Sequence, residues 1–389
     1  MRTVALDLGK RKTTLSEVHD GAVVARRTVR RISELHRDLG KQAPPARVAI
    51  EACRDAWAVH DLLTQWGNEV VVVDTTRVRQ LGVGRHGKKN DRIDADILAL
   101  ALEEGRIPKA HVLSPRARKV RELLTVREML VSTRARYVTQ CRALLQARLV
   151  TVPRCKAADF VPMMRELDLP SECRELVAPL LELLPSIELQ IAQVEERLHA
   201  LVEQTDVVQR LSTVPGVAVV VAAAFMCVID NPHRFKNARQ VSAYLGLVPR
   251  ERSSGGKRRL GSITKQGNTR LRKLLVQAAW TVLRSRSKDP LVLWCQRVAE
   301  RRGKRVAVVA TARRLAQVLW ALWRRGTVYT PARLAERSAS GHLRHSRDVA
   351  RHAAALRKSA DKLARQRRAS ARRAQRAREL LEPQPEVST

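Results

Sequence analysis

Four acidic residues in the first quarter of the chain have the types and spacing of a divalent-metal site. Asp7 and Glu51 each close an apolar, strand-like run, and Asp91 and Asp94 lie three apart in a segment with helical periodicity, so they share one helix face. Four converging carboxylates cannot all stay ionised at low cost without a cation. Mg²⁺ prefers such oxygen ligands, and two ions about 4 Å apart would clamp the attacking and leaving oxygens of a phosphodiester.

Each acid taken alone has a plainer interpretation. An acid at a strand end is common, and a helical Asp pair often lies on a solvated face or matches the positive end of a helix. Asp74, which also ends a strand-like run, and Asp96, which lies on another helix face, are the acids most easily mistaken for members of the set. The metal hypothesis therefore depends on a fold that brings the four acids together.

The first 110 residues alternate between strand and helix signals in an order that would do so. Helices are expected near 32–40, over 55–66 and over 91–104, and a hairpin turn at Asp20-Gly21. The expected strands are 3–8, 13–18, 22–29, 47–51 and 69–74. This order matches the ribonuclease-H-like fold, an α/β domain with a mixed sheet, in which the first and fourth strands are neighbours and Asp7 faces Glu51.

The charge balance predicts a polyanionic partner. The 389 residues include 74 Lys and Arg against 38 Asp and Glu, a net charge of +36, while 44% apolar residues supply real cores. Such an excess opposes compaction unless a polyanion or counterions neutralise it, so nucleic acid is the first candidate and an anionic membrane surface the second. No run has the roughly 20 apolar residues that a bilayer span needs. Six scattered cysteines indicate neither zinc nor disulfides, as in a reducing cytosol.

Residues 111–205 are expected to form two long helices that link two domains. Leu180 to Leu201 repeats apolar residues in a 4-3 heptad pattern, with Pro185 marking a helix start or a kink. This seam either packs on 115–150 in a local hairpin or joins copies of the chain in a coiled coil, giving a dimer or tetramer. The helix over 115–150 has few balancing acids, which favours contact with phosphates. Its candidate nucleic-acid contacts are Arg116, Arg118, Lys119, Arg121, Arg127 and Arg134.

Residues 206–330 are expected to form a mostly helical domain. The Val-Pro-Gly-Val turn at 214–217 resembles a helix-hairpin-helix element, whose backbone N–H groups hold a phosphate, although a simple buried helix is the alternative. The Gly- and Arg-rich loop after Pro249 carries Ser253 and Ser254, and its composition favours phosphate binding over a nucleophilic serine. The candidate contacts here are Arg252, Lys257, Arg258, Arg259, Lys265, Arg270 and Arg272. Residues 331–389 are expected to be a basic arm, disordered or helical only on nucleic acid.

Two sets of motifs carry a resemblance to a known family. Asp7-Leu8-Gly9, Glu51-Ala52 and Asn90-Asp91-Arg92-Ile93-Asp94-Ala95 resemble the DEDD motifs of Piv/MooV-type transposases and invertases of bacterial insertion sequences. The second set resembles the C-terminal transposase domain of that family: Pro215-Gly216, Phe235, Tyr244-Leu245-Gly246-Leu247-Val248-Pro249, Ser253-Ser254-Gly255, Arg259, Gly261, Lys265, Gly267-Asn268 and Leu271-Arg272. The resemblance spans roughly residues 1–330, and the basic arm departs from it.

The resemblance implies an architecture and a chemistry. It implies a RuvC-like DEDD domain at 1–110, a coiled-coil linker at 111–205 and a serine-bearing transposase domain at 206–330. The acids Asp7, Glu51, Asp91 and Asp94 would hold Mg²⁺, with Mn²⁺ as the alternative. The serine before the glycine, Ser254 with Ser253 as the alternative, would attack DNA and form a covalent phosphoserine. The implied partners are donor and target DNA and a structured guide RNA, in the bacterial cytoplasm at the nucleoid.

Two other functions fit the same residues. One is a Holliday-junction-type, structure-selective nuclease that uses metal-activated water, with the serines only binding phosphate. The other is a non-catalytic nucleic-acid-binding protein. Trapping on suicide DNA separates a recombinase, which leaves a protein–DNA adduct, from a nuclease, which leaves free nicked DNA.

Overall fold

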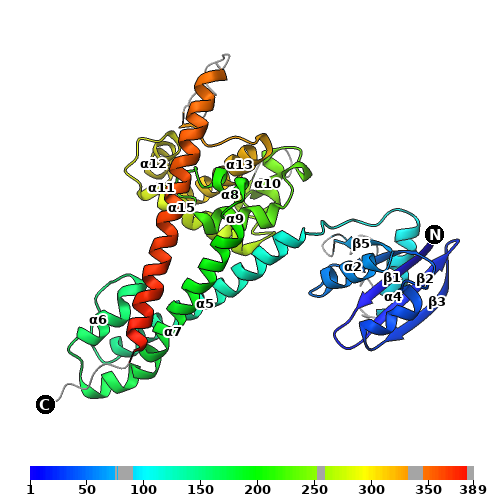
Figure 1. Ribbon diagram of the computed structural model, residues 1–389, viewed down its shortest axis with the longest axis horizontal. Helices are drawn as coiled ribbons and strands as arrows, with labels where there is room; N and C mark the ends of the chain where they lie inside the picture. Colours follow the sequence, from blue (N-terminus) through cyan, green and yellow to red (C-terminus); the bar gives the residue numbers. More distant parts are fainter. Residues whose placement is uncertain (75–76, 78–90, 252–258, 332–344, 383–389) are drawn as a thin grey trace. The chain divides into compact units, whose positions relative to one another are not determined.

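The chain divides into two compact units, Met1–Leu113 and Ser114–Thr389, which are described separately. The structure is a computed structural model that describes residues 1–74, 77, 91–251, 259–331 and 345–382 (Figure 1). The side chains of residues 91–93 and 345–352 lie outside this description.

The first unit is built on a five-stranded mixed sheet with the order β3-β2-β1-β4-β5. β1 pairs antiparallel with β2, as β2 does with β3, and β1 pairs parallel with β4, as β4 does with β5. The predicted antiparallel opening and parallel continuation are therefore confirmed. The strands are β1 (Arg2–Leu8), β2 (Thr13–His19), β3 (Ala22–Val29), β4 (Ala46–Glu51) and β5 (Glu69–Val73).

Helices cover both faces of this sheet. Val4, Leu6, Val48 and Ile50 pack on one face with side chains of α1 (His36–Leu39) and α2 (Ala56–Gln65). The alternate residues, Ala5, Ala49 and Val71 among them, pack on the other face against α4 (Asp91–Glu103). A 3-10 turn, η1 (Ile32–Leu35), precedes α1. The small residues under α4 let the helix lie close to the strands, so that the first unit has a sheet layer between two helical layers.

Three long helices dominate one part of the second unit: α5 (Pro115–Gln146), α7 (Ser171–Val202) and α15 (His345–Leu381). α7 packs against both α5 and α15 (Figure 1). Leu184, Ile191 and Leu198 of the predicted seam are buried within this single chain. The local hairpin with α5 is therefore present, and α15 adds a third helix to it. Pro185 lies inside α7 and does not begin it.

The expected basic arm, disordered or helical only on nucleic acid, has a different structure over His345–Leu381. This segment is one long helix, and Leu363, Ala377, Ser359 and Ser370 on it are buried. Few large apolar residues were available to signal a packed helix, because the helix docks through small and charged side chains.

The remaining helices of the second unit form a mostly helical body, as predicted. α9 lies at its centre, since its residues from Val221 to Ile229 are all buried, and it contacts α5, α8 and α11. A short hairpin, β6 and β7, projects from this body. The elements are η3 (Ala157–Asp159), α6 (Phe160–Glu166), α8 (Asp206–Leu211), α9 (Val219–Ile229), η4 (Pro232–Arg234), α10 (Ala238–Tyr244), β6 (Pro249–Glu251), β7 (Leu260–Ile263), α11 (Thr269–Arg284), α12 (Pro290–Arg302) and α13 (Lys304–Arg325).

Two of these helices are long and apolar enough to cross a membrane by length and composition, α7 and α13. The sequence analysis found no such segment. α7 forms ion pairs with α5 and α15 through Glu188 and Glu195, and α13 packs against α10, α11 and α12. Their apolar faces are therefore those of helices packed within a helical body.

Candidate active site and nucleic-acid interface

Asp7 and Glu51 lie on the same face and at the same edge of the sheet. Side chains alternate between faces along a strand, and Ala5 and Ala49 face α4, so Asp7 and Glu51, two residues further on, face α4 as well. Leu6 pairs with Ile50 in the parallel register, which places the next residues, the two acids, beside each other. The local sequence also shapes this edge. A Cβ on Gly9 would lie 2.6 Å from the carbonyl oxygen of Lys12, so the turn after β1 needs glycine.

The helix α4 runs antiparallel to β1, which brings its first turn to this edge. Asp96 accepts a hydrogen bond of 2.6 Å from the hydroxyl of Ser16, whose partner on β1 is Ala5. Further along α4, Glu103 accepts a hydrogen bond of 2.9 Å from the backbone N–H of Gly21, beside the start of β1. Asp94, one half-turn before Asp96, therefore lies about one strand residue closer to Asp7. It is half-buried.

The acids that looked most like false candidates have other partners. Asp96 forms an ion pair of 2.9 Å with Arg26 of β3 in addition to its bond with Ser16. The Oδ2 atom of Asp74 lies 3.7 Å from Nε of Arg77, in an ion pair. Asp96 therefore holds α4 to the sheet, and the arrangement separates it from Asp94 as the helix faces predicted.

The structure describes the side chains of three of the four predicted metal ligands, and these three carboxylates are not close enough together to hold a metal ion. Asp7, Glu51 and Asp94 are described, whereas the side chain of Asp91, the first residue of α4, is not. Among the described residues, no group of three or more His, Cys, Asp or Glu is close enough to hold a metal ion. The donor set nevertheless fits a hard divalent cation in kind, since all four side chains are carboxylates.

The candidate serines lie outside the described residues, as do Arg252, Lys257 and Arg258. The base of their hairpin is described, and two glycines shape it. Gly246 and Gly267 both have positive φ, and a Cβ on Gly246 would lie 2.1 Å from the carbonyl oxygen of Gln266. A backbone contact this close fixes the two ends of the segment that carries the loop.

Arg272 was predicted to contact nucleic acid, and the structure gives it another role. Its side chain is buried, with 8% exposed. The guanidinium donates to the carbonyl oxygens of Leu245 at 3.1 Å and Gln266 at 2.8 Å. Arg272 therefore braces the base of the serine hairpin, because its donors are consumed by backbone carbonyls.

Arg270 is likewise engaged inside the protein. It pairs with Glu128 of α5 and donates a hydrogen bond of 2.7 Å to the hydroxyl of Thr125. The hydrogen bond from Arg270 lowers the pKa of Glu128 below its ordinary value, despite the opposing effect of burial. Arg270 thus ties α11 to α5, and phosphate contact is not its primary role in this structure.

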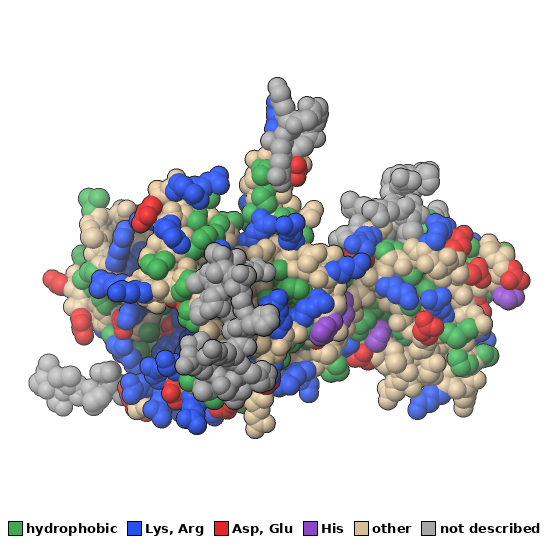
Figure 2. All heavy atoms as spheres, turned by 90° about the horizontal axis from the view of Figure 1, so that it is seen from above, with side chains coloured by type: hydrophobic (Ala, Val, Ile, Leu, Met, Phe, Trp, Pro, Cys, Tyr) green, Lys and Arg blue, Asp and Glu red, His purple; other side chains and the backbone are tan. Residues whose placement is uncertain are grey.

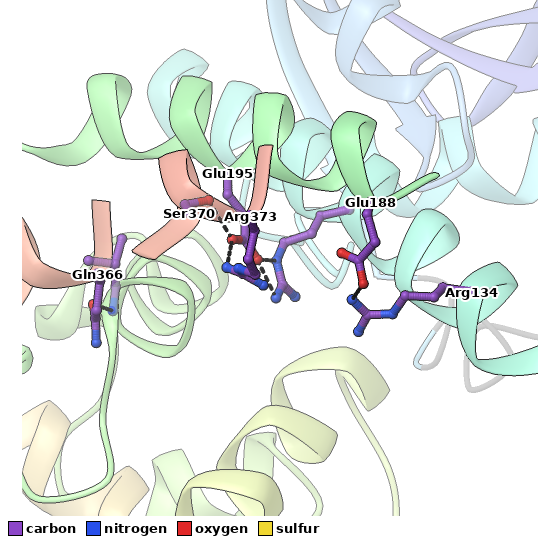
Figure 3. Close-up of polar contacts among 8 residues, drawn as sticks. Arg134, Glu188, Glu195, Gln366, Ser370 and Arg373 are labelled. Carbon is purple, nitrogen blue, oxygen red and sulfur yellow. Dashed lines mark hydrogen bonds and ion pairs between the residues drawn. The ribbon is translucent and has the colours of Figure 1, made fainter. Parts of the chain in front are cut away.

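Several candidate cations on α5 also have partners within the chain. Arg127 lies 2.7 Å from Glu195 and Arg134 lies 2.7 Å from Glu188, both on α7 (Figure 3). Arg116 donates to the hydroxyl of Thr205. These partners were not expected from the sequence, although a signal was present. The two arginines lie seven residues apart on α5 and their two partners lie seven residues apart on α7, as expected for two antiparallel helices that pack with a heptad seam.

The remaining candidate cations that the structure describes differ in exposure. Lys119, Arg259 and Lys265 are exposed, and Arg118 and Arg121 are half-buried. On the face shown in Figure 2, the helical unit carries many Lys and Arg side chains and few acids. These side chains make a cationic surface on the second unit.

A cleft of about 1050 Å³ adds cations that sequence reasoning missed. It lies between the β6–β7 hairpin and the helices α12 and α13. Among the described residues its lining contains no acid, and it includes Lys265, Arg302, Arg305, Arg313, Arg314 and Arg325. Four of these arginines, Arg305, Arg313, Arg314 and Arg325, belong to α13, which the sequence had indicated only as an apolar helix over 306–325.

Comparisons with known proteins bear on both units. Residues 4–148 match a DEDD transposase model, described as "Transposase", and residues 208–291 match the model "Transposase IS116/IS110/IS902 family". A probable family 20 transposase of Pseudomonas aeruginosa is 34% identical, over 84% of this chain and 98% of that protein. The chain belongs to the IS116/IS110/IS902 family of transposases.

Two further relatives of this transposase come from named insertion elements. The transposase of IS1111A from Coxiella burnetii is 33% identical, over 62% of this chain and 68% of that protein. The transposase of IS1328 from Yersinia enterocolitica is 29% identical, over 84% of this chain and 98% of that protein. The DEDD domain match includes Asp7, Glu51, Asp91 and Asp94, and a domain of this kind indicates dependence on a divalent metal. The suspected family is thereby confirmed.

Proposed function

We propose that this transposase moves its insertion sequence by cutting and rejoining DNA through a covalent phosphoserine, on a ribonuclease-H-like (RuvC-like) first domain. The observation that carries the proposal is the shared edge of the sheet. Asp7 and Glu51 end neighbouring parallel strands on the face that α4 covers, and the first turn of α4, with Asp94, runs to the same edge. Convergence of acids from separate elements is what a metal-dependent phosphodiester reaction needs.

Asp7, Glu51, Asp91 and Asp94 would hold Mg²⁺, with Mn²⁺ as the alternative. A bound divalent ion supplies positive charge that offsets the charge developing on the phosphodiester oxygens. The acids keep that charge at one place because three of them come from different elements, β1, β4 and α4.

Ser254, with Ser253 as the alternative, would be the nucleophile. Its hydroxyl loses a proton, its oxygen bonds to phosphorus, and the sugar oxygen leaves and takes up a proton. One P–O bond forms while one breaks, so the later rejoining needs no nucleotide co-substrate. Arg259 and Lys265, exposed residues that flank β7 of the same hairpin, would offset the added charge of the transition state.

The decisive experiment traps the intermediate on suicide DNA with Mg²⁺. We expect a protein–DNA adduct that is lost in Ser254→Ala and in Asp7→Asn and retained in Ser253→Ala, the matched control. If the adduct is lost in Ser253→Ala and retained in Ser254→Ala, the nucleophile is Ser253. Free nicked DNA without an adduct would replace the proposal with a nuclease that uses water, and activities unchanged in Asp7→Asn would indicate a non-catalytic binding protein.

We also propose that a structured RNA guides the choice of donor and target DNA. The cationic surface of the second unit supports a nucleic-acid partner, and sequencing the nucleic acid that co-purifies from the bacterial cytoplasm would identify it. Recovery of random cellular RNA alone would count against guidance. We expect a dimer or tetramer at the nucleoid, held by surfaces other than the α7 seam, since that seam is covered within the chain. Light scattering of the purified protein measures this.

A further inference from the structure

The helix α15 has one face docked on the second unit. Its buried residues Ser359, Leu363, Ser370 and Ala377 recur at intervals of four, seven and seven. This is the spacing of a helix that packs along a neighbour, and the neighbours are α7 and α8. The docked face is thus defined along most of the helix.

A buried carboxylate fixes the middle of this face. Glu195 of α7 has 5% of its surface exposed. It accepts a hydrogen bond of 2.9 Å from the hydroxyl of Ser370 and one of 2.6 Å from Arg373, both on α15 (Figure 3). It also forms an ion pair with Arg127 of α5. Burial would raise the pKa of Glu195, but the charges of Arg127 and Arg373 and their hydrogen bonds hold the pKa below its ordinary value. The three long helices therefore meet at one ionised group.

Further contacts fix the two ends of the face. Lys362 donates to the carbonyl oxygens of Ser212 at 3.0 Å and Val217 at 2.5 Å. One turn further along α15, Gln366 accepts a hydrogen bond of 3.4 Å from the backbone N–H of Val219, the first residue of α9. At the other end, Arg376 forms an ion pair of 2.8 Å with Asp159. Because these bonds span residues 362–376, the helix has a fixed rotation about its axis.

That fixed rotation gathers five cations on the opposite face. At about 100° per residue, they fall in an arc about 100° wide, centred roughly 165° from the docked residues. All are exposed, Asp361 is the acid among them, and they span about 22 Å along the axis. We call this set the α15 outer face: Arg357, Lys358, Arg365, Arg368 and Arg372.

We propose that the α15 outer face binds the phosphate backbone of duplex DNA, as an added surface of this transposase. The inference rests on the proposed function for its DNA partner. α15 lies beyond the residues matched by both family models, which end at 148 and 291. Cations held in place on a straight helix suit a stiff polyanion with one charge per about 1.7 Å.

A membrane surface fits this helix less well. An interfacial helix inserts an apolar face into the lipid while its cations face outward. Here the apolar side, with Leu363 and Ala377, is already packed on the protein. The positions between the outer cations are occupied by small or polar residues such as Ala364, Ala371 and Gln375.

The test compares two triple substitutions in full-length protein that also carries Asp7→Asn, so that binding is measured without chemistry. Arg365→Gln, Arg368→Gln and Arg372→Gln together should weaken binding to a 30-base-pair duplex roughly tenfold near 0.15 M salt. The slope of log K against log salt should fall by about 2.7, which is about 0.9 for each lost contact. The matched control, Arg286→Gln, Lys288→Gln and Arg297→Gln, removes three exposed charges elsewhere on the same unit and should change the slope by less than 1.

Two results would overturn the proposal. One is an equal change in both triple variants, which would show a general charge effect. The other is an unchanged duplex slope together with a lowered slope on a structured RNA, which would assign the face to RNA. The circular dichroism spectrum of the triple variant should match that of wild type, because the three side chains are exposed. If the spectrum differs, Arg368→Gln alone is measured in its place and should show one third of the change in slope. In the parent protein with Asp7 intact, the triple variant should still form the Ser254 adduct at saturating DNA, so failure of the outer face and failure of the phosphoserine are told apart.

Discussion

The acids of the two units have different surroundings. In the first unit, Asp7 and Glu51 share a face and an edge of the sheet, and the first turn of α4, with Asp94, runs to that edge. In the second, Glu188 and Glu195 are enclosed by arginines of α5 and α15. The difference follows from what each element packs against. An acid at the end of a strand lies at an open edge, whereas an acid on a central helix meets the side chains of its neighbours.

The largest expected effect comes from replacing, one at a time, two acids that lie two residues apart on α4. We expect Asp94→Asn to lower adduct formation on suicide DNA about 10³-fold, the scale of one lost electrostatic group at a phosphodiester, with the thermal midpoint unchanged. The matched variant Asp96→Asn should keep most activity and lose about 1 kcal/mol of unfolding free energy, because Ser16 loses its charged acceptor. The reverse pattern would place Asp96 in the site and Asp94 in the framework.

In the second unit, removal of a central acid should affect stability first. Glu195→Ala leaves Arg127 and Arg373 without their common partner, so we expect a loss of about 3 kcal/mol in urea unfolding. Since the folded pKa of Glu195 lies below its ordinary value, its contribution is complete at neutral pH and is lost as the pH falls through that folded pKa. A variant as stable as wild type at pH 7 would mean that α15 is held by other contacts.

A smaller effect should appear at alkaline pH through Lys362. Burial lowers the pKa of Lys362 from 10.5 to about 8, so the unfolded chain binds more protons between pH 8 and 10.5 and stability rises with pH in that window. Relative to Lys362→Met, wild type should gain about 2 kcal/mol across it. The comparison with a variant matters because Cys227 and Tyr329, whose pKa values are raised by burial, act in the opposite direction above about pH 9. A constant difference from pH 8 to 10.5 would contradict the burial of a neutral lysine.

The first unit could be predicted closely from the sequence because its signals are local. The apolar run over 3–8 predicted β1, and the alternation in 13–18 and 22–29 with the Asp20-Gly21 turn predicted the hairpin of β2 and β3. The predicted helices 55–66 and 91–104 match α2 and α4 within about a residue at each end. The placing of Asp7 beside Glu51 followed from strand order alone. The closeness of their side chains to Asp91 stays a prediction, because it depends on a residue outside the described side chains.

The second unit could be predicted only in part, because its arginines choose partners far along the chain. Arg127 and Glu195 are 68 residues apart, and Arg373 is further from Glu195 still. Composition indicated nucleic acid as the partner of Arg116, Arg127, Arg134, Arg270 and Arg272, and it gave no sign of the partners that they have within the chain. It also indicated that residues 331–389 are a basic arm, disordered or helical only on nucleic acid, because a helix that docks through Ser, Ala and Arg lacks the large apolar residues that mark a core.

The smallest effect concerns a cation of α5 that is exposed rather than paired. Lys119 is exposed, so Lys119→Gln should lower the salt slope of duplex binding by about 0.9, the value for one phosphate contact, and leave the unfolding free energy unchanged. Lys41→Gln, which removes an exposed charge from the first unit, is the control and should leave the slope unaltered. If Lys119→Gln changes nothing, α5 serves as a structural helix whose arginines face α7 and α11, and the cations that meet nucleic acid lie elsewhere on the second unit.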